Sequence, residues 1–308
     1  MPRASVALVT SSEIPDLDPD DAALIPLLAA RGVDARPAVW DNPGVDWDAF
    51  DLAVIRSTRD YSRRREEFVR WAHSVPRLAN TARAVEWNTD KHYLRDLEDA
   101  GVPIVHTDWL EPGRGLGSRG LHTRFPALGD FVIKPAVSAG SLDTERYSAA
   151  SAQARGRAIV HSLRLLGEGR TVMLQRYVQS IDTTGESALV FIEGRFAWAA
   201  RKEAMLDGQT GELAGVYRHG RTDGHEASEE EVATARQTLA AAARLLDCAG
   251  TPVSPFLYAR VDVVAGPNGP EVMELELTEP SLYAGLARGG PAVVAAAIAG
   301  RVLGDQAG

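Results

Sequence analysis

Two kinds of hydrophobic pattern divide the chain. In the N-terminal part, residues 6–10 and 52–55 are short apolar runs. Between them, residues 21–31 have apolar positions at helical spacing, and the pattern stops at Gly32. This strand–helix–strand order predicts a small parallel α/β unit.

The rest of the chain mixes helical spacing with short extended segments and tight turns. Such a mixture predicts antiparallel hairpins, so this part is expected to be α+β. Helices are predicted over residues 61–74, 91–100, 151–166, 232–246 and 291–303. Strands are predicted over residues 131–134, 171–178, 187–192, 196–201, 258–263 and 271–280, and residues 102–105 are expected to be a short extended segment.

The most informative pattern is the predicted hairpin near the C-terminus. Arg260 and Asp262 alternate along its first strand, and Glu274 and Glu276 alternate along its second. Side chains two residues apart in a strand point to the same face, so three carboxylates and a guanidinium should gather there. The apolar residues between them argue against a solvated acidic strand. Clustered carboxylates suit Mg²⁺ or Mn²⁺, so the hairpin predicts a site for metal and phosphate.

Two lysines stand beside segments suited to phosphate. Lys134 interrupts an apolar strand, and the loop after it, residues 136–141, has small side chains that let backbone amides approach an anion. The loop lacks the Walker pattern, so alone it is a weak indication. Lys91 stands at a predicted helix start, where an ordinary exposed position also explains it. Both lysines offer a point charge to phosphate oxygens.

Composition narrows the classes of function. The chain has 308 residues, 45% of them hydrophobic, which predicts about two domains. With a net charge of −9 and no basic block, no nucleic-acid partner is expected. No apolar stretch is long enough to span a bilayer, so no membrane partner is expected either. The single cysteine, Cys248, is predicted to be a buried small residue, and the lack of any internal disulfide fits the cytoplasm. Hydrolase and zinc-protease motifs are absent.

Five elements follow one another along the chain: Lys91, Lys134 with its loop, residues 175–178, residues 186–202 and the acidic hairpin. In this order the sequence resembles the ATP-grasp superfamily over nearly its whole length. The segments that carry the resemblance are WNTDK at 87–91, VIKPAVSAG at 132–140 and ELELTEPSL at 274–282. The chain is most similar to the glutathione-synthetase-like branch that includes the O-ureido-serine cyclo-ligases.

This resemblance implies an ATP-grasp fold, in which an N-terminal parallel α/β domain precedes two α+β lobes that clamp ATP. It places a substrate domain at residues 1–85, a central lobe with the phosphate loop at 86–174, and a C-terminal lobe with the metal-binding hairpin at 175–308. The implied cofactors are ATP and Mg²⁺, with Mn²⁺ as an alternative.

The resemblance also assigns roles to single residues. Gln175 and the backbone near Tyr177 and Val178 would hold adenine, and Glu186, or alternatively Asp182, would hold the ribose. The residues implied in nucleotide binding are Lys91, Lys134, Ser138, Gly140, Ser141, Gln175, Tyr177, Val178 and Glu186. The metal ligands implied are Asp262, Glu274 and Glu276.

Arg260 would contact the transferring phosphoryl group, together with Arg201 or Lys202. These two are adjacent on a strand, so only one can face the site comfortably. In one place the sequence departs from the family, because relatives usually have Glu-x-Asn where this chain has Glu274 and Glu276. The extra carboxylate should tighten metal binding or shift the substrate preference.

The implied activity is a carboxylate–nitrogen ligase that works through an acyl phosphate on a small amino-acid-like substrate. One such reaction closes a ring within O-ureido-D-serine during antibiotic biosynthesis. The alternatives are a ligase that joins two substrates, a phosphotransferase on the same fold, and a non-catalytic nucleotide-binding module. A homo-oligomer is a further expectation. Arg56 and Arg59 could meet a substrate carboxylate or lie on the surface, and residues 215–224 form a second candidate specificity loop.

Overall fold

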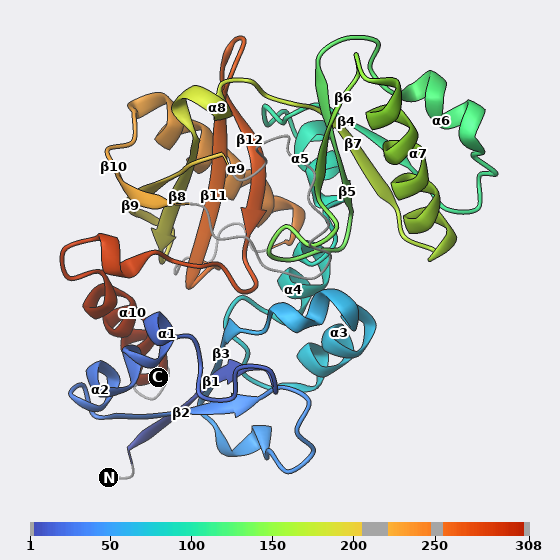
Figure 1. Cartoon of the computed structure of the whole chain (residues 1–308). Helices are drawn as coiled ribbons and strands as arrows, with labels where there is room; N and C mark the ends of the chain where they lie inside the picture. The colour runs from blue at the N-terminus through green and yellow to red at the C-terminus, as the bar shows by residue number, and fades with distance from the viewer. Residues whose placement is uncertain (1–2, 205–220, 248–254, 305–308) are drawn as a thin grey trace.

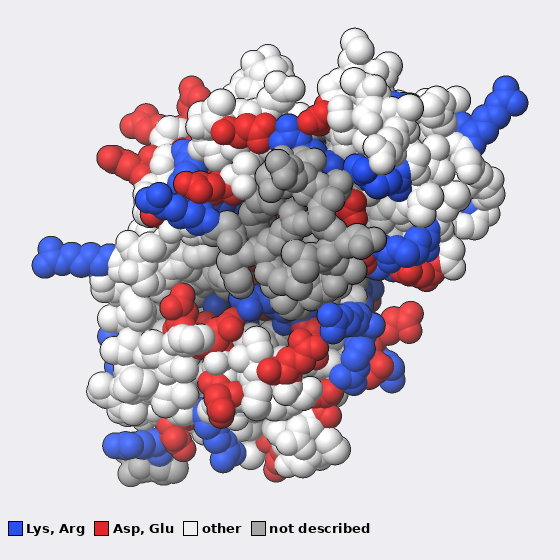
Figure 2. Space-filling model, viewed as in Figure 1, with Lys and Arg blue, Asp and Glu red and all other residues white. Residues whose placement is uncertain are grey.

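The computed structural model of the chain describes residues 3–204, 221–247 and 255–304, and its strands form three separate sheets. The three sheets are arranged around the middle of the molecule. In Figure 1 the parallel sheet lies below the two antiparallel ones. Acidic and basic side chains are interspersed over the face that Figure 2 shows. Cys248 and residues 215–220 of the candidate specificity loop lie outside the described residues.

The N-terminal unit is a parallel sheet with the strand order β2-β1-β3, as the strand–helix–strand pattern predicted. Its strands are Ala4–Thr10 (β1), Val33–Val39 (β2) and Leu52–Ser57 (β3). The sequence patterns did not predict β2, because at this edge of the sheet exposed polar residues alternate with buried ones. The predicted helix over 21–31 is two short helices, Pro19–Ala22 (α1) and Leu24–Ala29 (α2). Pro26 explains the break, since it has no amide hydrogen and its ring crowds the carbonyl four residues earlier.

Further helices follow this sheet. The prediction over 61–74 holds from Arg65, and the residues before it form a 3₁₀ helix. The helices are Arg65–Ser74 (α3), Ala82–Asn88 (α4) and Tyr93–Asp99 (α5). The 3₁₀ helices are Trp47–Ala49, Arg59–Arg63 and Ala284–Leu286.

The second sheet is antiparallel and has the strand order β4-β7-β5-β6. Its strands are Thr107–Leu110 (β4), Asp130–Pro135 (β5), Glu145–Ser148 (β6) and Val172–Arg176 (β7). The helices Ser118–Arg124 (α6) and Ala152–Gly167 (α7) cover one face of this sheet (Figure 1). The short extended segment expected at residues 102–105 makes one isolated bridge, at Ile104, and the strand itself begins at Thr107.

The third sheet is also antiparallel, with the order β10-β9-β8-β11-β12. Its strands are Glu186–Ile192 (β8), Arg195–Lys202 (β9), Thr222–His225 (β10), Tyr258–Gly266 (β11) and Gly269–Glu276 (β12). A short helix, Ile181–Thr184 (α8), leads into it, and Glu229–Leu245 (α9) packs on one face. Leu239 of α9 shares a core with Val261 and Leu275 of the hairpin. The polar residues between these apolar ones therefore point to the opposite face of the sheet.

The last helix, Gly290–Gly304 (α10), returns to the beginning of the chain. Val294 and Ile298 pack in one core with Leu28 of α2 and Val6 of β1. The predicted domain boundaries after residues 85 and 174 stay a prediction. Within the described ranges, every helix is too short or too polar to cross a bilayer.

Candidate active site

A pocket of about 270 Å³ lies between the second and third sheets, and the hairpin of β11 and β12 contributes to its wall. It gathers most of the residues that the sequence singled out, although these are spread over more than half of the chain. The predicted residues that line it are Lys91, Lys134, Ser138, Gly140, Ser141, Gln175, Tyr177, Val178, Glu186, Lys202, Arg260, Glu274 and Glu276.

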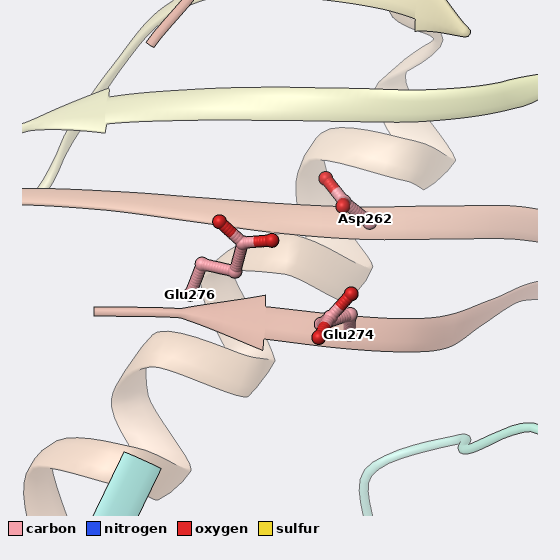
Figure 3. A group of neighbouring side chains, drawn as sticks. All are labelled: Asp262, Glu274 and Glu276. Atoms are coloured by element: carbon pink, nitrogen blue, oxygen red, sulfur yellow. The ribbon is translucent and has the colours of Figure 1, made fainter. Parts of the chain in front are cut away.

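The acidic hairpin has the register that the alternating pattern requires. Asp262 pairs with Glu274 across the two strands, and Arg260 pairs with Glu276. One carboxylate oxygen from each of Asp262, Glu274 and Glu276 lies within 4.8 Å of the others. Figure 3 shows the three carboxylates clustered across the paired strands. Three converging carboxylate oxygens fit a hard divalent cation such as Mg²⁺.

Asp262 is fully buried beneath the pocket and carries a negative charge there. Burial alone would raise its pKa, but Arg260 and Lys202 hold the pKa well below its usual value. The Nε atom of Arg260 lies 2.8 Å from Oδ1 of Asp262, and Nζ of Lys202 lies 2.7 Å from Oδ2. Two cations therefore stabilise this ionised carboxylate.

The two glutamates of the hairpin have different environments. Nζ of Lys91 lies 3.0 Å from Glu274, and Lys91 and Lys134 lower the pKa of this carboxyl against the effect of burial. Burial raises the pKa of Glu276 to about 7, although its ion pair with Arg260 opposes the shift. Of the three carboxylates, Glu276 is therefore the one that is most easily protonated.

The structure brings Lys202 into the pocket and turns Arg201 away from it. Adjacent residues on β9 point to opposite faces, so Lys202 reaches Glu186 and Asp262 while Arg201 reaches the other side. There, Nη2 of Arg201 lies 2.6 Å from Nε2 of His225. Arg201 is therefore not a group that can touch a reactant in this pocket.

The geometry also separates Glu186 from Asp182. Glu186 lines the pocket, where burial raises its pKa against the opposing charge of Lys202. Asp182 lies outside the lining and forms an ion pair with Arg146 at 3.0 Å, as well as a hydrogen bond from Tyr177. Of the two carboxylates, Glu186 is placed to meet a ligand.

Lys134 and the small-residue loop face the hairpin across the pocket. Nζ of Lys91 donates a hydrogen bond of 2.9 Å to the carbonyl of Ser138. This bond connects the loop to the segment just before α5. Gly140 and Ser141 both have left-handed backbones, with φ of 59° and 61°, which turn the loop sharply. Burial lowers the pKa of Lys134 to about 8, and the nearby charges of Lys91 and Lys202 add to this, while Glu274 opposes it.

Part of the pocket lining is apolar. Val132, Val178 and Met273 supply apolar side chains there. Gln175 is held in place because its Nε2 donates to Oγ1 of Thr107 at 2.8 Å. The amide of Tyr177 donates to the carbonyl of Asp130, so it is not a free donor for a ligand.

The use of lysine is a signal that the sequence prediction overlooked. The chain has 33 lysine and arginine residues, and only Lys91, Lys134 and Lys202 are lysines. All three line the pocket. A lysine offers a compact point charge that the guanidinium of arginine does not copy, so its confinement to one pocket is compatible with a phosphate ligand.

Residues from the N-terminal unit also reach the pocket. Arg59 and Tyr61 line it together with Glu279, Ser281 and Tyr283, which follow the hairpin. Two interpretations of Arg59 were open from the sequence, a contact with the substrate or a surface position, and the structure places Arg59 in the pocket lining. Arg56, in contrast, is buried and is held by Asp21 and the carbonyl of Pro280 at 2.9 Å each.

Comparisons with known proteins find relatives over nearly the whole chain. Residues 6–80 match the family model of the N-terminal domain of D-cycloserine synthetase DcsG. The cycloserine biosynthesis protein DcsG of Streptomyces lavendulae is 34% identical over 305 residues, which cover 96% of this chain and 98% of that protein. The crystal structure of D-cycloserine synthetase DcsG superposes with a TM-score of 0.85 and 32% identity, covering 97% of this chain and 100% of that one.

A more distant structure shares the fold. The ATP-grasp ligase PsnB, in complex with a phosphomimetic variant of its minimal precursor, Mg and ADP, has a TM-score of 0.60 and 18% identity, and covers 97% of this chain and 99% of its own.

The fold and the enzyme class follow from these observations. The protein has an ATP-grasp fold, with an N-terminal parallel sheet and two antiparallel α+β lobes, and it is an ATP-grasp ligase homologue. Within this superfamily, the chain belongs to the DcsG family of D-cycloserine synthetases.

Proposed function

We propose that the protein is an ATP- and Mg²⁺-dependent carboxylate–nitrogen ligase that closes a ring within one substrate of the O-ureido-D-serine type during cycloserine biosynthesis. The observation that supports this most is that the three clustered carboxylates of the hairpin lie at or directly beneath one pocket, which every lysine of the chain lines. The identity of 34% to a cycloserine biosynthesis protein supports the choice of substrate.

The residues divide the work by charge. Asp262, Glu274 and Glu276 would hold Mg²⁺, which when bound offsets the negative charge of the ATP phosphates. Lys91, Lys134 and the loop around Ser138 would bind phosphate oxygens, and the apolar end near Val178 would hold adenine. Lys134 would be charged with ATP bound, because phosphate favours its protonated form.

The first chemical step is phosphoryl transfer. An oxygen of the substrate carboxylate attacks the γ-phosphorus, the bond from this phosphorus to the bridging oxygen breaks, and ADP leaves. The product is an acyl phosphate. Arg260 and Lys202 stabilise the charge that is shared between the attacking and leaving oxygens in this step.

The second step forms the carbon–nitrogen bond. A nitrogen of the same molecule attacks the acyl carbon, phosphate leaves with the electrons of the broken carbon–oxygen bond, and the nitrogen loses a proton. Because the nitrogen and the carboxyl belong to one molecule, ring closure gains from proximity.

A single screen tests the proposal. Release of ADP and of free phosphate is measured with Mg-ATP against O-ureido-D-serine, amino acids and dipeptides, and the cyclic product is detected by mass spectrometry. The proposal expects ADP, phosphate and ring product in equal amounts from O-ureido-D-serine alone. ADP release that requires a second amine would instead indicate a two-substrate ligase, and a stable phosphorylated product without free phosphate would indicate a phosphotransferase.

Matched variants test the assignment of the phosphate-binding lysine. Lys134→Ala should weaken ATP binding by about 10- to 100-fold, the size expected for one lost charge-assisted contact. Lys134→Arg keeps the charge and should lose less. Equal ATP affinity in Lys134→Ala and in the unmodified protein would contradict this role.

A further inference from the structure

One carboxylate of the pocket differs from the others in its partners. Glu279 follows the hairpin by three residues and is half-buried at the end of the pocket that Arg59, Tyr61 and Ser281 also line. It belongs to none of the metal, phosphate or adenine contacts assigned above. A carboxylate in such a place calls for a partner.

The other half-buried carboxylates of this lining each have a cation beside them. Glu186 pairs with Lys202, Glu274 with Lys91 and Glu276 with Arg260. Glu203 is exposed at the rim, where water can solvate it. Among the described residues, no lysine, arginine or histidine nitrogen lies within ion-pair distance of Glu279.

The nearest cations are occupied elsewhere. Arg59 binds Asp18 at 2.8 Å and the hydroxyl of Ser281 at 3.1 Å. Lys91 is held by Glu274 and the carbonyl of Ser138. Both raise the electrostatic potential at Glu279, but neither lies within ion-pair distance of it.

The local electrostatics favour a positively charged ligand beside Glu279. Burial and the neighbouring Glu276 raise the pKa of Glu279 to about 8, while the hydroxyl of Tyr61 and the charge of Arg59 oppose this shift. A cationic group at this place would compensate for the lost hydration and for the repulsion from Glu276. In the proposed reaction the substrate carboxylate lies near Arg260, which also lines this pocket, so an amino group of the same molecule is the candidate for this cation.

We infer that Glu279 binds the protonated α-amino group of the substrate, so that the enzyme selects zwitterionic α-amino acids over carboxylates that lack an amine. The inference rests on the proposed function, because it assumes that the substrate carboxylate is phosphorylated in this pocket. It adds a specificity-determining residue that contacts neither ATP nor the metal.

The test compares two substrates that differ only in the amine. ADP release is measured with O-ureido-serine and with 3-(ureidooxy)propanoate, which lacks the α-amino group. In the unmodified enzyme, kcat/KM should favour the amino substrate by about 10- to 100-fold, as expected for a charge-assisted hydrogen bond. In Glu279→Gln this ratio should fall to near one. Glu279→Asp keeps the charge and should retain part of the ratio.

The control is Glu98→Gln, which removes one negative charge from an exposed position of α5. It should keep the ratio of the unmodified enzyme. Equal loss of kcat/KM for both substrates in Glu279→Gln would overturn the inference and indicate an effect on the neighbouring metal ligands. An unmodified enzyme that does not discriminate between the two substrates would also overturn it, without the need for any variant.

Failure of the proposed function would look different. In that case the unmodified enzyme would release no ADP with any carboxylate substrate. Binding of the two compounds is then measured by calorimetry in the presence of Mg²⁺ and a non-hydrolysable ATP analogue. Binding that prefers the amino compound and loses this preference in Glu279→Gln would still support the ammonium site. Binding without preference, or no binding of either compound, would overturn it.

Discussion

The ammonium of Lys202 lies 2.7 Å from a carboxylate oxygen of Asp262, a residue that has no exposed surface. Arg260 contacts the same carboxylate at 2.8 Å, and Lys91 contacts Glu274 at 3.0 Å. The cations of the pocket and the acids of the hairpin thus neutralise one another. The phosphates of ATP offer these cations alternative partners, and the carboxylates are then free to hold a metal ion.

The buried pair predicts an effect on stability. Lys202→Met leaves the charge of Asp262 with Arg260 as its only cation, so the free energy of unfolding should fall by about 1–3 kcal/mol. Urea denaturation measures this. Arg201→Met changes the neighbouring residue on the other face of β9, where the side chain is partly exposed, and should cost less than about 1 kcal/mol. Equal losses in the two variants would contradict the description of the pair.

The environment of Lys134 predicts a pH dependence of its chemical reactivity. Because burial lowers its pKa to about 8, half of this amine should be neutral and nucleophilic at about pH 8, whereas an ordinary lysine is still protonated there. Trace labelling with acetic anhydride, followed by peptide mass spectrometry, should give a midpoint near pH 8 for Lys134. Lys91 and Lys202, whose pKa values are raised by carboxylates, should react only at higher pH.

Labelling should also report the ligand. Mg-ATP should slow the reaction of Lys134, because a bound phosphate both covers the amine and favours its protonated form. A midpoint near 10.5 or no protection by Mg-ATP would contradict the assignment of Lys134.

The carboxylate that replaces the usual asparagine predicts a change in metal affinity. Glu276→Asn restores the family pattern and removes one negative charge from the proposed ligands, so the Mg²⁺ concentration that gives half-maximal ADP release should rise about tenfold. Glu271→Gln on the same strand lies outside the pocket lining and should leave the Mg²⁺ dependence as it was. An unchanged Mg²⁺ requirement in Glu276→Asn would contradict the expected contribution of the Glu276 charge to metal affinity.

Asn80 connects the N-terminal unit to the hairpin by hydrogen bonds. Its Nδ2 donates to the carbonyls of Tyr258 and Leu277 at 2.8 and 2.7 Å, and its Oδ1 accepts from the amide of Leu257 at 2.8 Å. Asn80→Ala leaves these buried backbone groups unpaired and should lower the free energy of unfolding by about 2–4 kcal/mol. The exposed Asn42 is the control, and its change to alanine should cost less than about 1 kcal/mol.

Local patterns predicted the centre of the site but not its surroundings. The period of two along β11 and β12 was sufficient to place Asp262 and Glu274 on one face, because a strand fixes the direction of each side chain. The edge strands β2 and β4 were missed, since exposed polar residues interrupt their apolar pattern.

Contacts between distant segments were beyond any local pattern. Asn80 meets Leu277 across 197 residues, and Tyr61 meets Glu279 only because the N-terminal unit packs beside the hairpin. The periodicity of apolar residues within one element carries no information about such contacts between distant elements. The domain boundaries and the homo-oligomer remain predictions for the same reason.

We propose the acidic hairpin as the metal and phosphoryl-transfer site of the ligase. The most direct test is ADP release from Mg-ATP and O-ureido-D-serine by Asp262→Asn, with the folded state checked by its thermal melting curve. The account predicts a folded protein whose ADP release is nearly abolished, because the amide supplies no charge to hold the metal or to orient Arg260 and Lys202. ADP release by folded Asp262→Asn at the rate of the unmodified enzyme would contradict it.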